Sequence, residues 1–339
     1  MSLPTRKIGD TTVSAIGFGA MGLSAGYGKV ESHEEGLDFL DEVLKRGCTF
    51  WDTSDAYLDN EELIGKWFAR SGRREDVFLA TKFGLADPTR FPNGDPDYVR
   101  EEFARQLKKL QTDYVDLYYL HRADPTVPIE KTVGAMAELV KQGKVKYLGI
   151  SEVSSATLRR AHAVHPIAAL QVEYSPIELA IESEQLGLLK TARELGIAIV
   201  AYSPLGRGLL SGQYTSLDAL PDTDFRKIIP RIGGNSGKNF DRINVLAQEL
   251  ARIGAAHSTT AGQVTLAWLL AQGDDVIPIP GTKKVKYLEE NLGALKIKLS
   301  DEEVKAVRQL AEKAQEDLPG ARYPEYMIKL EYSDTPALA

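Results

Sequence analysis

The feature of this sequence that most constrains its fold is a regular alternation of short apolar segments with helical patterns. From residue 17 to residue 292, apolar runs of strand length are each followed by an amphipathic stretch of helical period. Strands that alternate with helices predict βαβ units and a parallel sheet. The runs are apolar almost throughout, as is typical of parallel strands covered by helices. The chain is therefore predicted to be an α/β protein.

Eight β/α units can be counted, with no break in composition between them. Eight such units favour a closed (β/α)8 TIM barrel in one domain spanning residues 1–339, and a doubly wound open sheet is the alternative. A hairpin over residues 5–17, two additional helices and a tail over residues 317–339 complete the prediction. The expected strands lie near Phe18 and over 48–51, 77–81, 115–120, 145–150, 168–172, 197–201 and 276–279. The expected helices are 32–45, 60–69, 97–110, 129–141, 154–164, 183–195, 260–271 and 285–292, with 239–256 and 300–314 as the additions.

Composition narrows the class of protein and its partners. The chain is 43% hydrophobic with a net charge of −7, which is typical of a globular protein and disfavours nucleic acid as a partner. No run approaches the roughly 18 apolar residues of a membrane helix, so no membrane association is expected. The single cysteine, Cys48, allows no intrachain disulfide, which favours a cytoplasmic location. No metal site is predicted, and the sequence indicates no oligomeric state.

The segment Gly17-Phe18-Gly19-Ala20-Met21-Gly22 matches the G-x-G-x-x-G pattern of dinucleotide-binding folds. That pattern requires a helix that opens at the glycines and holds the pyrophosphate at its N-terminus. Here a glycine-bearing loop follows, and the capping box at Ser32–Glu35 predicts that the helix starts only there. We therefore reject a Rossmann fold and expect a first strand whose glycines let a ligand approach the backbone.

Four polar residues follow or end apolar runs in three successive predicted strands. Asp52 ends the second strand, Tyr57 lies in the loop after it, Lys82 ends the third strand and His121 ends the fourth. In a barrel, catalytic residues come from the carboxyl ends of the strands, so these side chains should converge. Lys82 would lower the pKa of the Tyr57 phenol and be partnered by Asp52. His121 would hold a carbonyl oxygen near Tyr57, which then acts as general acid.

None of these four residues is a hydride source, so a reduction would need a cofactor. Gly281-Thr282-Lys283-Lys284 follows the eighth strand and opens a helix, which predicts a phosphate site. Ser151, Gln171 and Tyr202 stand at other strand ends and would suit a nicotinamide carboxamide. Gln171 interrupts an apolar run, which indicates a buried hydrogen bond.

Several further segments complete a resemblance to the aldo-keto reductases over nearly the whole chain. The sequence is most similar to the yeast and plant branch that includes pyridoxal reductase and perakine reductase. The matching segments are Gly17–Gly22, Asp52–Tyr57, Asn60–Gly65, Thr81–Gly84, Tyr118–Arg122, Gly149–Glu152, Gln171–Ser175, Tyr202–Gly208 and Pro278–Thr282.

This resemblance implies NADPH-dependent reduction of an aldehyde or ketone by a tetrad of Asp52, Tyr57, Lys82 and His121. It implies that NADP(H) binds extended, with Tyr202 stacked on the nicotinamide. Ser203, Leu205, Gly206 and Gly208 would line the pyrophosphate. The other cofactor contacts implied are Gly19, Met21, Asp52, Ser151, Gln171, Gly281, Thr282, Lys283, Lys284, Glu290 and Asn291.

The sequence departs from its relatives in two places. Leu58-Asp59 directly follows the tyrosine, where relatives have a glycine and a longer loop, so the pocket shape should differ. An arginine often used for the 2′-phosphate aligns near Tyr287, so the preference for NADP over NAD rests on Lys283 and Lys284.

Other interpretations remain open from the sequence. A Schiff-base aldolase could use Lys82, and a cofactor-binding regulatory subunit could keep the tetrad with little turnover. Taken singly, Asp52 could cap a helix, and Lys82, Lys283 and Lys284 could be solvated. Trp51 is expected in the barrel core. The substrate is an apolar or aromatic small-molecule carbonyl compound if the tail tyrosines Tyr323 and Tyr326 reach the pocket. Pocket walls are expected from loops 23–30, 85–95, 122–127 and 205–235 and from the tail 317–339.

Overall fold

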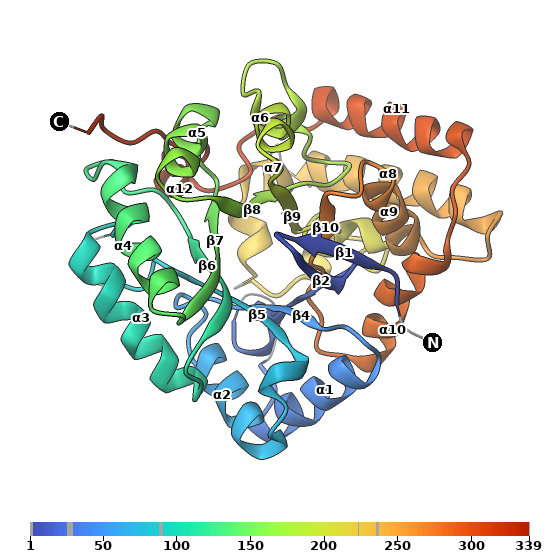
Figure 1. Ribbon diagram of the computed structural model, residues 1–339. Coiled ribbons are helices and arrows are strands. Elements are labelled where there is room, and N and C mark those ends of the chain that lie inside the picture. Colours follow the sequence, from blue (N-terminus) through green and yellow to red (C-terminus); the bar gives the residue numbers. More distant parts are fainter. Residues whose placement is uncertain (1–2, 26–29, 88–90, 223, 235–236, 339) are drawn as a thin grey trace.

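The protein forms a barrel of parallel strands surrounded by helices (Figure 1). The computed structural model describes residues 3–25, 30–87, 91–222, 224–234 and 237–338. Within these residues, eight strands form one sheet in the order β10-β9-β8-β7-β6-β5-β4-β3. Gly17 N donates to Pro278 O at 2.9 Å and Gly19 N to Pro280 O at 3.4 Å, which joins the two edges of the sheet. The predicted (β/α)8 barrel is confirmed, and the open sheet is excluded.

The observed elements follow the predicted alternation. The strands are β3 (Phe18–Gly19), β4 (Phe50–Asp52), β5 (Phe78–Phe83), β6 (Val115–Leu120), β7 (Val145–Ser151), β8 (Ile167–Glu173), β9 (Ala198–Tyr202) and β10 (Val276–Pro278). The surrounding helices are α1 (His33–Lys45), α2 (Asn60–Ser71), α3 (Pro96–Leu110), α4 (Ile129–Lys141), α5 (Ser155–Val164), α6 (Leu188–Glu194), α9 (Ala261–Leu270) and α10 (Val285–Gly293). The predicted additional helices are α8 (Lys238–Ala255) and α11 (Asp301–Asp317), and two short helices are α7 (Pro230–Gly233) and α12 (Glu325–Ile328). Within the described ranges, none of these helices has the length and apolar character needed to cross a bilayer.

Helix starts are set by local sequence, as the capping boxes predict. The Ser32 side chain accepts from Glu35 N and begins α1, and Ser300 does the same with Glu303 N for α11. After the glycine-rich segment the chain makes only a short 3₁₀ turn, Ala20–Leu23. The structure therefore supports rejection of the Rossmann interpretation.

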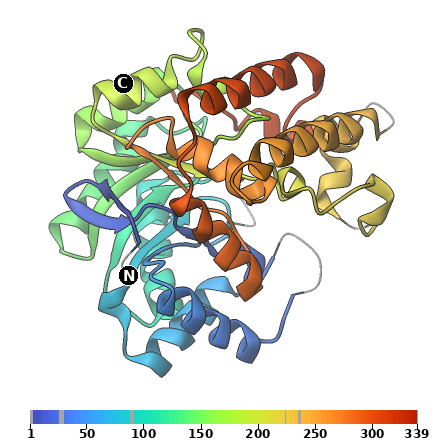
Figure 2. The same cartoon turned by 90° about the vertical axis from the view of Figure 1, so that its right-hand side faces the viewer.

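A two-stranded hairpin closes one end of the barrel. It consists of β1 (Thr5–Ile8) and β2 (Thr11–Ser14), and its Ile8 and Val13 join the apolar cluster inside the barrel. Figure 2 shows the hairpin at one end of the molecule and the segment after β9 at the opposite end. The hairpin thus leaves the carboxyl ends of the strands free for a site.

Side chains of β4 alternate between the inside and the outside of the barrel. Phe50 belongs to the inner cluster, whereas the ring of Trp51 packs 4.7 Å from the ring of Trp67 on α2. The prediction that Trp51 lies in the barrel core is therefore wrong. Because strand side chains alternate with period two, an inward Phe50 requires an outward Trp51 and an inward Asp52.

The helix predicted over 183–195 is shorter in the structure. A 3₁₀ turn at Ala180–Glu182 and a loop come first, and α6 begins only at Leu188. Gly187 adopts a left-handed conformation with φ of 54°, which interrupts a helix at that residue.

Two glycines inside helices allow a matched test of this packing. A Cβ on Gly65 of α2 would lie 2.0 Å from Lys109 O of α3, whereas a Cβ on Gly134 of α4 would meet nothing within 4 Å. We expect Gly65→Ala to lower the free energy of unfolding by about 1–3 kcal/mol because the helices must separate. Gly134→Ala should leave it unchanged or raise it by about 0.5–1 kcal/mol, since alanine favours helix. Urea unfolding of both variants measures the difference, and equal stability of the two variants would contradict this packing.

Candidate active site

A buried ion pair lies where β4 and β5 end. Lys82 is fully buried, and its Nζ donates to Asp52 Oδ1, to Thr53 O at 2.7 Å and to the Tyr57 hydroxyl at 3.4 Å. The parallel register sets Asp52 beside Ala80, two residues before Lys82 on the neighbouring strand. Three of the four residues predicted to converge are thus bonded through one ammonium group.

The surroundings keep Lys82 charged and Tyr57 protonated. Burial alone would lower the pKa of Lys82, but the negative charge of Asp52, followed by Tyr57, outweighs it and the pKa is raised. Burial raises the pKa of Tyr57, Lys82 opposes this, and Asp52 reinforces it, so that the net direction is upward. Lys82 therefore acts on Tyr57 in the predicted sense, but the predicted net lowering is not found, because desolvation of the phenolate is the larger effect.

His121 follows β6 and faces the same place. Its ring lies edge-on to the Tyr57 ring at 6.0 Å between centroids, and its Nδ1 is 3.0 Å from Ser54 Oγ. Burial, Lys82 and Arg122 together hold its pKa well below the ordinary value. His121 is therefore a neutral imidazole with one nitrogen engaged by Ser54 and the other available to a ligand.

Gln171 has a partner that the sequence did not reveal. Its Nε2 donates to Asp52 Oδ2 at 2.7 Å, across the barrel from β8 to β4. Both carboxylate oxygens of Asp52 are thus bonded, which stabilises a charge buried at this depth. Ser151 stands beside Gln171 in the register of β7 and β8, and its Oγ accepts from Arg122 Nη1 at 3.0 Å.

The C-terminal tail fixes Tyr202 at the end of β9. The Tyr202 hydroxyl is 2.9 Å from Glu152 Oε1 and 3.0 Å from the Tyr323 hydroxyl, and Arg322 Nη1 donates to it at 3.1 Å. Arg322 also forms a buried ion pair with Glu152. Sequence reasoning missed Glu152 and Arg322, since a lone arginine in a tail has no pattern that distinguishes it from a solvated one.

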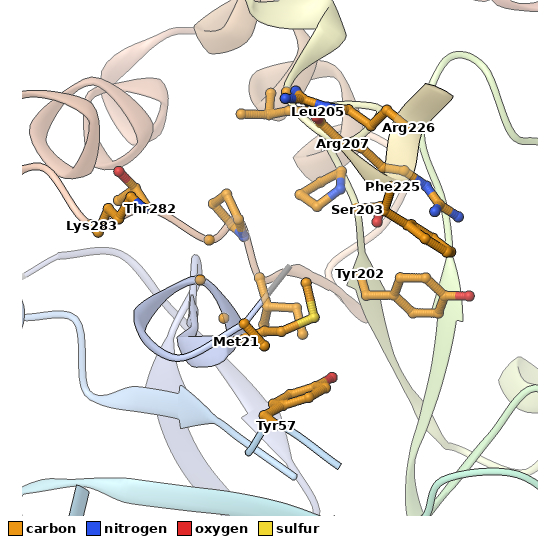
Figure 3. A pocket seen from close by; sticks show the side chains of 18 of the residues that line it. Met21, Tyr57, Tyr202, Ser203, Leu205, Arg207, Phe225, Arg226, Thr282 and Lys283 are labelled. Carbon is orange, nitrogen blue, oxygen red and sulfur yellow. Dashed lines mark hydrogen bonds between the residues drawn. The ribbon is translucent and has the colours of Figure 1, made fainter. Parts of the chain in front are cut away.

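A cavity of about 960 Å³ runs from Tyr57 and His121 to the start of α10. Figure 3 shows Met21 between Tyr57 and the segment that carries Thr282 and Lys283. Gly206 is the exception among the predicted cofactor residues: it is not on the wall, and a Cβ there would lie 2.8 Å from Ile177. The predicted residues on the wall are Gly19, Met21, Asp52, Ser151, Gln171, Tyr202, Ser203, Leu205, Gly208, Gly281, Thr282, Lys283, Lys284, Glu290 and Asn291.

The floor of this cavity suits an elongated ligand with phosphate groups. A Cβ on Gly19 would lie 2.7 Å from Ile279 O, and one on Gly281 would lie 2.9 Å from Gly19 O. Only glycines let these backbones approach so closely. Lys283 and Lys284 line the cavity where α10 begins, and a helix N-terminus with lysines favours an anion.

The remaining walls are mainly apolar and come from the loops and the tail. They include Ala25, Leu85, Phe91, Leu220 and Met327. Residues 26–29 and 88–90 of two predicted wall loops, and residues 223 and 235 of a third, lie outside the described residues.

The barrel carries a tyrosine, an ammonium and a neutral imidazole at its carboxyl face, and a cavity suited to a phosphate-bearing ligand lies beside them. Together these features indicate an enzyme that acts on a carbonyl group with a dinucleotide cofactor. These groups are suited to protonating a carbonyl oxygen next to a bound dinucleotide.

Comparison with known proteins gives the family. The model of the aldo/keto reductase family matches residues 15–312. The chain is 59% identical to aldo-keto reductase str7 of Strobilurus tenacellus, with 95% of each chain covered. It is 49% identical to aldo-keto reductase yakc [NADP(+)] of Schizosaccharomyces pombe, covering 100% of this chain and 99% of that one. The protein belongs to the aldo/keto reductase family and is an oxidoreductase of the carbonyl-reducing class.

Solved structures agree with this assignment. The thermostable aldo-keto reductase Tm1743, in complex with the inhibitor epalrestat, superposes with a TM-score of 0.72 at 33% identity, covering 91% of this chain and 100% of that chain. The glycerol dehydrogenase AKR11B4 of Gluconobacter oxydans gives 0.80 at 25% identity, covering 93% and 97%.

A second set of buried polar residues, from α2 and α3, forms hydrogen bonds with β5. Glu61 Oε1 accepts from Thr81 Oγ1 at 2.6 Å and from Gln106 Nε2 at 2.7 Å, and Gln106 Nε2 also donates to Lys82 O at 2.8 Å. Glu61 Oε2 has no hydrogen-bond partner among the described residues, and burial raises the pKa of Glu61 to about 7. This carboxyl group is thus mainly the acid below about pH 6 and is about half ionised at pH 7.

This raised pKa predicts a pH-dependent stability. Between the unfolded value of 4.5 and about 7 the folded state binds more protons at Glu61, so stability falls as pH rises through that window. Glutamine does not titrate, so Glu61→Gln should not lose stability over this pH range. Its free energy of unfolding, relative to that of the natural protein, should therefore rise by on the order of 1–3 kcal/mol from about pH 5 to about pH 8. Denaturant unfolding at several pH values measures the gain, with Glu62→Gln on the exposed side of α2 as control. A difference that does not vary with pH would refute the assignment.

Proposed function

We propose that this protein reduces an aldehyde or ketone to the alcohol with NADPH, with Tyr57 as the proton donor. The observation that carries the proposal is the contact of Lys82 Nζ with both the Asp52 carboxylate and the Tyr57 hydroxyl at the end of the cavity. The reaction consumes one carbonyl compound, one NADPH and one proton, and releases the alcohol and NADP⁺.

The tetrad divides the work on the carbonyl oxygen. Tyr57 and His121 both line the cavity, and the Tyr57 hydroxyl and His121 Nε2 would hydrogen-bond the same oxygen. As negative charge develops on that oxygen, Tyr57 transfers its proton, and the ammonium of Lys82 stabilises the phenolate left behind. Asp52 keeps Lys82 charged throughout, because it is the main source of the upward shift in the pKa of Lys82.

NADPH fits the wall residues and would supply the hydride to the carbonyl carbon. Tyr202, Ser151 and Gln171 lie at the tetrad end of the cavity, where they would hold the nicotinamide. Ser203, Leu205 and Gly208 would face the pyrophosphate, and Lys283 and Lys284 the 2′-phosphate. The name of the yeast relative, which specifies NADP(+), supports this choice.

The proposal treats residues 1–339 as one catalytic unit, because the barrel and the tail both line the cavity. It also places the enzyme in the cytoplasm, in keeping with a chain that has a single, buried cysteine.

No observation favours the two alternative functions. A Schiff-base aldolase needs a neutral amine, and Asp52 holds the pKa of Lys82 above its ordinary value. A regulatory subunit with little turnover has no use for Asp52, Lys82 and Tyr57 in bonding contact with His121 beside them.

Tyr57→Phe tests the proton donor. We expect turnover of a test aldehyde to fall by about 10²- to 10⁴-fold, because a positioned general acid contributes that much. NADPH binding, followed by fluorescence, should persist. Tyr98→Phe, which removes a buried hydroxyl away from the cavity wall, is the matched control and should keep its activity. Full activity of Tyr57→Phe would overturn the assignment.

Lys283→Gln and Lys284→Gln test the 2′-phosphate site. Loss of a charge-assisted contact should raise the Kd for NADPH by about tenfold and leave the Kd for NADH nearly unchanged. Lys286→Gln, on α10 but not on the cavity wall, is the control. Equal effects on NADPH and NADH would place the 2′-phosphate elsewhere.

A further inference from the structure

Arg122 is a buried cation on the wall of the substrate cavity. It directly follows His121 after β6, and the residue as a whole is only 4% exposed. The tetrad and the cofactor proposal leave it without a role, although it lines the cavity beside His121.

The hydrogen bonds of Arg122 leave part of its guanidinium group unused. Nη1 donates to His121 O at 2.8 Å and to Ser151 Oγ at 3.0 Å. Both acceptors are neutral. Over the described ranges, no hydrogen-bond acceptor in the protein is found for Nε or Nη2, and Arg122 lines the cavity.

Arg122 also differs from the other buried arginines because it lacks an ion pair among the described residues. Arg207 pairs with Glu173, Arg226 with Asp224 and Arg322 with Glu152. Arg122 makes no ion pair with any carboxylate in the described part of the chain. Buried charges in proteins are normally paired, so an unpaired one at a cavity indicates a ligand of opposite charge.

The charge of Glu152 acts on this cation, but Glu152 makes no ion pair with it among the described residues. Burial acts to lower the pKa of Arg122, but Tyr202, Glu152 and Tyr323 outweigh it and the pKa is raised, so the group stays charged. The two oxygens of Glu152 are bonded instead by Arg322 and by the hydroxyl of Tyr202.

The surroundings would strengthen binding of an anion. The Tyr323 ring centroid lies 6.0 Å from the Arg122 guanidinium carbon, and Leu85, Phe91 and Met327 supply apolar wall. In such a setting little water competes with the guanidinium, and a carboxylate matches its planar donors.

We propose that Arg122 binds an anionic group of the substrate, and that this enzyme takes aldehydes or ketones that carry a carboxylate. This inference rests on the proposed carbonyl reduction. It adds that the aromatic and apolar walls receive the body of the substrate while Arg122 receives its charge.

The natural protein supplies the first test. Initial rates of NADPH oxidation are compared for pairs in which one member carries a carboxylate and the other a neutral group in its place: each of the three carboxybenzaldehydes with its methyl ester, and succinic semialdehyde with butanal. We expect kcat/KM to favour the acid by about 10- to 100-fold in at least one pair, because a charge-assisted contact is worth that ratio. Equal or lower values for every acid overturn the inference while leaving carbonyl reduction intact. No oxidation with any member, acid or neutral, would instead refute the proposed function.

Arg122→Gln supplies the second test. Glutamine keeps a donor for Ser151 Oγ but removes the charge, so the acid of the preferred pair should lose its advantage through a higher KM. Because Arg122 also acts on His121 and Ser151, the neutral member should lose some kcat/KM too, and the acid should lose about tenfold more than it does. Arg122→Lys should retain part of the preference, since it keeps the charge without the planar fork. Arg308→Gln, which removes an arginine that pairs with Glu182 and is not on the cavity wall, should show the same acid preference as the natural protein.

Two results with Arg122→Gln would overturn the inference. An unchanged acid preference would show that another group recognises the charge. Equal losses for acid and neutral substrates, together with weaker NADPH binding, would assign Arg122 to the cofactor. If Arg122→Gln does not fold, the pairs measured with the natural protein and with Arg122→Lys decide the question.

Discussion

The buried ion pair between Lys82 and Asp52 is the interaction on which the rest of this site depends. Two charges removed from water are stabilised only when every remaining lone pair and proton has a partner. Here Thr53 O and the Tyr57 hydroxyl accept the remaining hydrogen bonds of the Lys82 ammonium. Gln171 donates to the second carboxylate oxygen of Asp52 from the opposite side of the barrel. The contacts that offset the cost of burying these two charges also orient the ammonium toward the Tyr57 hydroxyl, which must lose a proton in the proposed reaction. Stability and chemistry are therefore served by a single arrangement.

The barrel positions this pair through its register. Strand side chains alternate, so an apolar inner cluster that includes Phe50 and Ala80 also directs Asp52 and Lys82 inward. The hairpin covers the amino end with Ile8 and Val13, which leaves the polar residues at the other end in contact with the cavity. The tail then returns to that end, where Arg322 and Tyr323 hold Glu152 and Tyr202.

Some features of the site were beyond sequence reasoning for physical reasons. Gln171 is visibly out of place in an apolar run, but its partner Asp52 is 119 residues away and becomes a neighbour only when the sheet closes. The net direction of the pKa of Tyr57 depends on how much burial opposes Lys82, and burial is a property of the packed molecule. Trp51 is equally apolar whether it faces the interior or the helices, so its side followed only from the register of β4. Gly206 shares its motif with wall residues but turns away from the cavity.

The sequence by itself determined the eight β/α units, the starts of α1 and α11 at their capping boxes, and the polar residues at the strand ends. These are local properties: apolar period, side-chain capping and the position of a residue within its own strand. Tertiary structure decided which of those residues touch. It joined Lys82 to Asp52 and Tyr57, left Arg122 charged without a carboxylate partner among the described residues, and brought Arg322 back to Glu152 across 170 residues. Such contacts arise from barrel closure, which brings distant segments together and which no local pattern in the chain records.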